Sequence, residues 1–135
     1  MMSKDIDFEL KKKYSLLTIK WCREHFGINN RKRTKLKFIL TKKTRNIRKS
    51  NSIVYGRYCF WRNTITIYAP NCKKIEQIVS TIIHEYTHYL QSRTKYKKYE
   101  KTHYYSTHPL ERSAFRNEQL YTKQCITEIK KLINN

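Results

Sequence analysis

Two histidines four residues apart, with a glutamate directly after the first, are the residues of this chain whose spacing best suits chemistry. They are His84, Glu85 and His88, in the stretch IIHEYTHYLQ at residues 82–91. Side chains four positions apart on a helix project from the same face, so two imidazoles can hold one metal ion. H-E-x-x-H on a helix is the pattern of a zinc-binding histidine pair whose glutamate serves as general base. We therefore expect a helix here that carries two ligands of a metal site.

The helix expected around this motif turns its histidines away from its apolar side. Apolar side chains recur at helical intervals, namely Ile75, Ile78, Val79, Ile82, Ile83, Tyr86 and Leu90. At about 100° per residue, this stripe lies almost opposite the two histidines. We predict one helix over about residues 72–96, with Asn71 as its N-cap. Both histidines should then face a cleft or solvent.

A third ligand must come from another element, because a catalytic zinc site takes three protein ligands and keeps one position open. The last helix, predicted over residues 109–133, carries Glu111 and Glu118 in the middle of a broad apolar face. A carboxylate buried without a partner is costly or is forced to protonate. A metal ion on the preceding helix would be such a partner for Glu111, and a salt bridge is the alternative.

Glu118 lies two helical turns from Glu111, about 10 Å away, which is too far to share the ion easily. For this side chain we favour a salt bridge or a hydrogen bond to a ligand histidine. Ala114, three residues after Glu111, is one of only two alanines in the chain. A small side chain there would let the last helix approach its neighbour closely.

The remaining elements follow from the same periodicities. Residues 5–26 place Leu10, Tyr14, Leu17 and Trp21 on one helical face, and Gly27 ends that helix. The alternating segment TKLKFILTKK predicts a half-buried strand, and SIVYGRYCFW (52–61) with NTITIYAP (63–70) predicts an antiparallel hairpin in which Gly56 marks a bulge. Residues 95–108 are expected to be an irregular connection.

The predicted order is therefore helix, three strands, helix, loop and helix, which defines an α+β fold class. A length of 135 residues suits a single domain over residues 1–135. The four cysteines form no C-x-x-C pair, so we expect ordinary reduced thiols.

The motif and its downstream partner resemble a known family of enzymes. H-E-Y-T-H at residues 84–88, followed by H-P-L-E-R-S-A at residues 108–114, resembles the gluzincin branch of zinc metallopeptidases. The resemblance is greatest to small intracellular members, the ImmA/IrrE-like and SprT-like domains, and covers about residues 52–116. It implies a minimal zincin-like fold: an N-terminal helix, a small three-stranded sheet with an antiparallel hairpin, the HExxH helix and a C-terminal helix that carries the third ligand.

This resemblance also implies the chemistry of the site. One Zn²⁺ per chain would be bound by His84, His88 and Glu111, and Glu85 would be the general base for a zinc-activated water that hydrolyses peptide bonds. The protein or peptide substrate would add as an antiparallel strand along an edge strand formed by residues 63–70.

The chain departs from the family pattern at two points, and each leaves an alternative third ligand open. His108 stands where the pattern often has asparagine, so this histidine is one alternative. SprT-like enzymes use a third histidine, for which His103 has a suitable spacing, although the H-G pair usual there is absent. Tyr104 or Tyr105 would hydrogen-bond the tetrahedral oxyanion that such a site must stabilise.

The formal net charge of +20, from 30 Lys and Arg against 10 Asp and Glu, indicates a second class of function. Basic residues concentrate in residues 31–50 and 93–101, and tyrosines at 96, 99, 104 and 105 could stack on bases. The partner would be nucleic acid or a polyanionic assembly, including a viral or organellar particle. The alternative function is then a basic binding or structural protein on a zincin scaffold with little or no turnover. The alternative to such a partner is a solvated basic face with no dedicated ligand.

No membrane partner is expected from this sequence. No apolar run approaches 18 residues, and the N-terminal MMSKDIDFELKKK is charged where a signal peptide would be apolar. We therefore expect an intracellular, cytoplasm-like location.

Overall fold

The computed structural model describes residues 4–32, 34–44 and 53–134. Its elements are α1 (Lys4–Phe26), β1 (Lys37–Thr41), β2 (Gly56–Cys59), β3 (Thr64–Tyr68), α2 (Ile75–Leu90), α3 (Arg93–Thr102) and α4 (Pro109–Asn134). Two 3-10 turns lie at Ala69–Asn71 and Tyr105–Thr107. The α+β class predicted from the sequence is confirmed. No described helix is long and apolar enough to cross a membrane.

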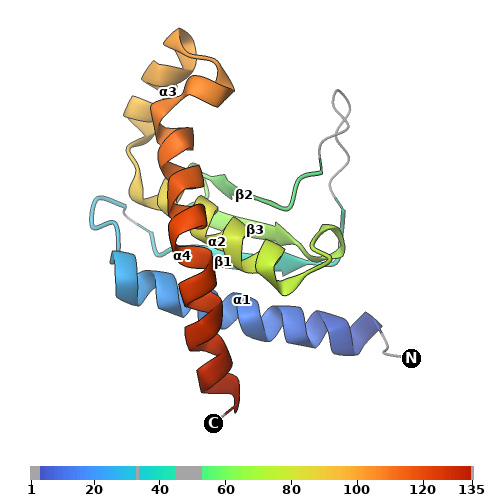
Figure 1. The fold of residues 1–135 in the computed structure, drawn as a ribbon. Coiled ribbons are helices and arrows are strands. Elements are labelled where there is room, and N and C mark those ends of the chain that lie inside the picture. The colour runs from blue at the N-terminus through green and yellow to red at the C-terminus, as the bar shows by residue number, and fades with distance from the viewer. Residues whose placement is uncertain (1–3, 33, 45–52, 135) are drawn as a thin grey trace.

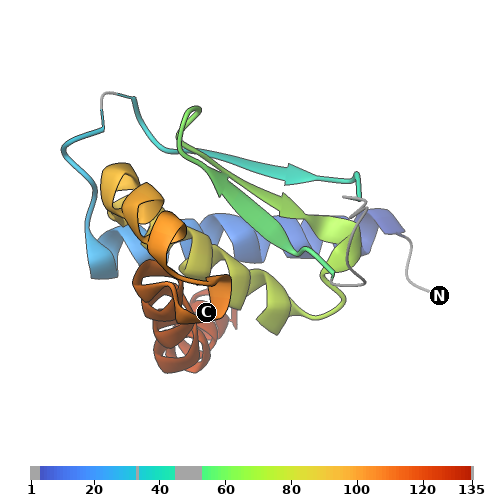
Figure 2. The same cartoon turned by 90° about the horizontal axis from the view of Figure 1, so that it is seen from above.

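The helices lie in layers against the small sheet. Figure 2 shows α1 and α2 on one face of the sheet and the long helix α4, labelled in Figure 1, on the far side of α2. The buried apolar side chains of α1, β3, α2 and α4 form one core cluster. Because α2 packs on the sheet, on α1 and on α4, ten of its 16 residues are buried, and these include polar ones such as Thr81, His84 and His88.

The sheet has the strand order β1-β3-β2, so the expected edge role of residues 63–70 is wrong. β3 is the central strand, parallel to β1 on one side and antiparallel to β2 on the other. Its apolar side chains explain this position, since Ile65 and Ile67 are both 0% exposed. The strand edge next to α2 and α3 therefore belongs to β2.

The predicted antiparallel hairpin is confirmed, although β2 begins only at Gly56 and residue 52 lies outside the described residues. At the turn Asn63 takes a left-handed φ of 45°, a conformation that asparagine tolerates better than most residues. Its side chain accepts a 2.6 Å hydrogen bond from the Tyr58 hydroxyl and donates to the Thr34 carbonyl at 2.8 Å. The turn is thereby tied to the segment that precedes β1.

The helix predicted over residues 72–96 is two helices, which corrects both its start and its end. Asn71 does not cap α2, because its side-chain amide donates to the Val54 carbonyl at 2.8 Å. The chain leaves the helical conformation at Gln91 (φ −86°, ψ 159°). Ser92 then caps α3 by accepting from the backbone N–H of Lys95, a role that serine commonly takes. Much of the segment expected to be irregular is therefore helical.

The buried face of α1 is only partly the predicted one. Tyr14 and Trp21 are buried, but Leu10 is 41% exposed. Ser15 and Thr18 are buried instead, and their hydroxyls donate to carbonyl oxygens four residues earlier at 2.7 and 2.6 Å. Because these bonds satisfy the hydroxyls locally, the two residues can occupy the core.

The predicted apolar face of α4 is buried at Ala114, the small residue expected to face a neighbouring helix. Ala114 is 0% exposed at the contact between α2 and α4, as expected for a small residue that lets two helices approach. Cys125 and Ile129 are also fully buried, whereas Phe115 and Leu132 are exposed. The four cysteines are free thiols, as predicted.

Gly56 permits a close approach of β2 to β3 and α2 rather than a bulge, because it pairs in register with Ile67. A Cβ atom there would lie 2.7 Å from both Ile67 Cδ1 and the Thr66 carbonyl oxygen, and 2.9 Å from Thr81 Cγ2. We predict that Gly56→Ala lowers the free energy of unfolding by about 1–3 kcal/mol, as overpacking does. Urea unfolding measures this change.

Gly27 offers a matched control. Its φ is 81°, but nothing lies within 4 Å of its missing Cβ. Asparagine tolerates this conformation, so Gly27→Asn should cost about 1 kcal/mol or less. An unchanged stability of Gly56→Ala would contradict the close approach of these elements.

Candidate metal centre

Three buried side chains from two helices converge on one point. His84 and His88 project from α2, and Glu111 projects from the first turn of α4. Oε1 of Glu111 lies 3.2 Å from Nε2 of His84 and 3.0 Å from Nε2 of His88. One donor atom from each residue lies within 4.8 Å of the others, so the group could hold a metal ion. The structure thus brings together the three side chains favoured from the sequence.

The chemistry of these donors suits a metal ion. Two imidazole nitrogens and one carboxylate oxygen are ligands that zinc takes in catalytic sites, although other divalent metals accept them too. The three residues His84, His88 and Glu111 are only 7%, 5% and 4% exposed. A cation bound there would therefore be screened little by solvent, and its charge would act strongly on its neighbours.

Each histidine has a partner at its other ring nitrogen. His84 Nδ1 lies 2.9 Å from Oε1 of Glu118, and His88 Nδ1 lies 2.7 Å from Oε1 of Gln91. Each oxygen accepts a hydrogen bond from Nδ1–H, which fixes the ring orientation and leaves Nε2 directed at Glu111. The bond between Glu118 and His84 confirms the interpretation favoured for this glutamate.

Gln91 is a contributor that sequence reasoning missed. Its amide nitrogen also donates to the Leu110 carbonyl at 2.9 Å. One side chain therefore orients His88 and ties the end of α2 to the residue before Glu111. The sequence shows only a polar residue three positions after His88. The bond from Gln91 to the Leu110 carbonyl depends on the tertiary fold.

Tyr96 is the second residue that was missed as part of the site. Its hydroxyl donates to Oε2 of Glu111, and its ring packs edge-on against His88 at 5.5 Å between centroids. Burial and the hydrogen bond to Glu111 raise the pKa of this phenol well above its usual value. The sequence assigned Tyr96 to a basic surface because the break between α2 and α3 could not be foreseen.

The two alternative ligands lie outside the group of three. His108 is buried, and its Nε2 donates to the Tyr96 carbonyl while its Nδ1 accepts from the Leu110 N–H, at 2.9 and 3.2 Å. Both of its ring nitrogens are thus occupied by backbone. His103 is exposed and contacts the Thr102 hydroxyl at 2.8 Å. His108 holds α3 against the start of α4 in this structure.

Glu85 lines the same cleft as the three donor side chains. The cleft has a volume of about 290 Å³, and its lining consists of Gly56, Arg57, Tyr58, Phe60, His84, Glu85, His88, Tyr96, Tyr105 and Glu111. Burial raises the pKa of Glu85 to about 7, with the charge of Glu111 acting in the same direction and the two histidines opposing it. Of the two expected tyrosines, Tyr105 lines the cleft, whereas Tyr104 is 84% exposed and does not.

The hydrogen bonds between the histidines and Glu111 shift the pKa values of His84 and Glu111 in opposite directions. Burial alone would raise the pKa of Glu111, but hydrogen bonds from His84 and His88 hold it well below its usual range. Burial opposes protonation of His84, yet its bonds to Glu111 and Glu118 raise its pKa to about 10. Without a metal, a protonated His84 imidazole thus offsets the charge of the buried Glu111 carboxylate.

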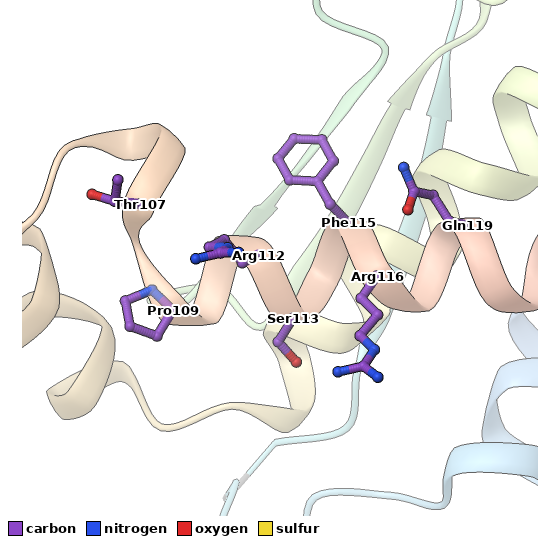
Figure 3. A pocket seen from close by; sticks show the side chains of 7 residues that line it. All are labelled: Thr107, Pro109, Arg112, Ser113, Phe115, Arg116 and Gln119. Atoms are coloured by element: carbon purple, nitrogen blue, oxygen red, sulfur yellow. The ribbon is translucent and has the colours of Figure 1, made fainter.

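A second hollow lies on the outer side of α4, and its lining offers no metal ligand of the usual kinds. Its volume is about 580 Å³, and Figure 3 shows its lining side chains, Thr107, Pro109, Arg112, Ser113, Phe115, Arg116 and Gln119. None of these described residues offers an imidazole, thiolate or carboxylate. Phe115 separates this hollow from the metal centre, since its ring contacts that of His84 at 4.6 Å between centroids.

Comparisons with known proteins find no matching family model, no matching curated protein and no matching solved structure. The candidate centre therefore rests on the geometry of its own residues.

We predict that removing either orienting partner weakens metal binding at this centre, with Zn²⁺ as the probe, while leaving the three donor side chains in place. Glu118→Ala and Gln91→Ala should each reduce zinc affinity about 10–100-fold, the usual effect of losing such a partner. Competition with a chromophoric chelator measures the affinity, and circular dichroism checks the fold. Glu100→Ala, an exposed glutamate of α3, is the matched control and should change nothing. Unaltered affinity in both site variants would contradict the assigned roles.

Proposed function

We propose that this chain is a zinc-dependent hydrolase that cleaves peptide bonds. The observation that carries the proposal is the convergence of His84, His88 and Glu111 next to Glu85 in one cleft. A three-ligand site with a neighbouring carboxylate is the arrangement that metal-assisted hydrolysis requires. The resemblance of H-E-Y-T-H and H-P-L-E-R-S-A to gluzincin metallopeptidases supports the choice of zinc and of a peptide substrate.

Zinc, when bound, lowers the pKa of a water molecule and polarises the carbonyl under attack. Glu85 would take the proton of the attacking water and deliver it to the leaving amine. Its position in the cleft suits this task, and so does a pKa raised to about 7 by burial, because a base works best when its pKa is near the working pH.

The other cleft residues would bind and orient the substrate. β2 is the strand edge beside the site, and Gly56, Arg57 and Tyr58 of this strand line the cleft. An extended peptide could pair with β2 and present a carbonyl to the centre. Tyr105 is the better placed of the two expected tyrosines to donate a hydrogen bond to the oxyanion, since it lines the cleft.

The proposal predicts that Glu85→Gln keeps the metal and loses turnover. Glutamine preserves the shape of the side chain but cannot accept the proton, so kcat should fall about 10²–10⁴-fold. Elemental analysis should still find one zinc per chain, and a library of quenched fluorescent peptides reports cleavage.

Glu76→Gln provides the matched control, because Glu76 is an exposed residue of the same helix outside the cleft. It should retain full activity. The proposal would be overturned by a zinc-loaded native protein that cleaves no peptide of the library. Equal cleavage by the Glu85→Gln variant would also overturn it.

A further inference from the structure

A cluster of cations and aromatic rings borders the cleft and shares only Phe60 with its lining. We call it the cationic platform and define it as Lys32, Phe60, Trp61, Arg93 and Lys97. These residues come from the loop after α1, from the β2–β3 turn and from α3. Figure 2 shows these three segments gathered at one end of the sheet.

Trp61 is the exposed centre of the platform. It lies in the β2–β3 turn and is 80% exposed, although an indole in water is unfavourable. The guanidinium carbon of Arg93 lies 3.5 Å from the centroid of its ring, and Nζ of Lys97 lies 5.9 Å away. With this exposure, the ring face opposite Arg93 is open to a ligand.

Lys32 extends the platform to the cleft. Its Nζ lies 5.2 Å from the ring centroid of Phe60 and 5.5 Å from that of Tyr58, and both rings line the cleft. Burial lowers the pKa of Lys32, and the charges of Arg93 and Arg31 lower it further. The cations are therefore close enough to repel one another.

Within the described part of the chain, the cations of the platform, Lys32, Arg93 and Lys97, have no carboxylate as an ion-pair partner. Like charges held together without counter-charges favour the binding of an anion, which would relieve the repulsion.

We propose that the platform binds single-stranded nucleic acid. A base stacks on the open face of Trp61, opposite Arg93, while Arg93, Lys97 and Lys32 contact the neighbouring phosphates. An exposed indole beside cations suits this ligand better than an acidic peptide, because every nucleobase offers a flat face for stacking. The net charge of +20 gives long-range attraction to a polyanion.

This surface differs from the footprint inferred from the sequence. Residues 93–101 contribute Arg93 and Lys97, but Trp61 was assigned only to the hairpin. Part of the basic segment 31–50, at residue 33 and residues 45–50, lies outside the described residues. The proposal does not rest on the hydrolase function, since none of the platform residues is a metal donor and only Phe60 lines the cleft.

The test uses a fluorescein-labelled 20-nucleotide oligo(dT) and measures its anisotropy over a salt series. Trp61→Ala should weaken binding about tenfold, the loss expected for one stacked base, whereas Trp61→Phe should retain most of the affinity. The double variant Arg93→Ala/Lys97→Ala should also bind more weakly and should show a salt slope reduced by about one to two. Trp61 is exposed in a turn, so these changes leave the core intact.

The second readout is tryptophan fluorescence. Trp21 is buried and donates to Glu128 at 2.9 Å, so quenching by the oligonucleotide should come from Trp61 and disappear in Trp61→Phe. The matched control is Lys123→Ala/Lys130→Ala, two exposed lysines of α4, which should bind like the native protein.

Two results would overturn the proposal. The first is native affinity in Trp61→Ala, or an equal loss in the α4 control, since either means that diffuse charge alone binds the oligonucleotide. The second is binding of poly-glutamate with the same dependence on Trp61, which would assign the platform to acidic peptides.

Discussion

The carboxylate of Glu111, buried between two helices, is the constraint on which the rest of the structure depends. Its oxygen Oε1 faces both imidazoles at 3.2 and 3.0 Å, and Oε2 accepts from Tyr96. A buried carboxylate must be neutralised and hydrogen-bonded. The chain meets this demand with histidines that can give up a proton for a metal ion. The interaction that joins α2 to α4 is therefore also the one that builds the site.

Three residues outside the group of donors support this contact between α2 and α4. Ala114 is fully buried and lets α4 approach α2, Gln91 ties the end of α2 to the Leu110 carbonyl, and His108 bonds to the backbone at Tyr96 and Leu110. Together they hold the first turn of α4 within reach of α2. The position of Glu111 is thus determined by contacts with α2, α3 and the turn before α4, which limits how far the donor atoms can separate when no metal is bound.

Much of this arrangement could be predicted from local patterns, and the remainder could not. Helical periodicity placed His84 and His88 opposite the apolar stripe of α2, and the isolated acids on the apolar face of α4 indicated Glu111 and Glu118. Tertiary pairing determined the rest. The position of β3 between β1 and β2 depends on a parallel contact with no local signal, and the end of α2 is tied by Gln91 to the Leu110 carbonyl, 19 residues away. Tyr96 reaches the site because the chain changes direction between α2 and α3.

The most direct test of this account is X-ray absorption at the zinc edge of the zinc-loaded protein. The account predicts about two imidazole nitrogens and one carboxylate oxygen at roughly 2.0–2.2 Å, with loss of the carboxylate contribution in Glu111→Gln. A shell containing sulfur at about 2.3 Å would contradict it. So would a zinc environment without imidazole scattering.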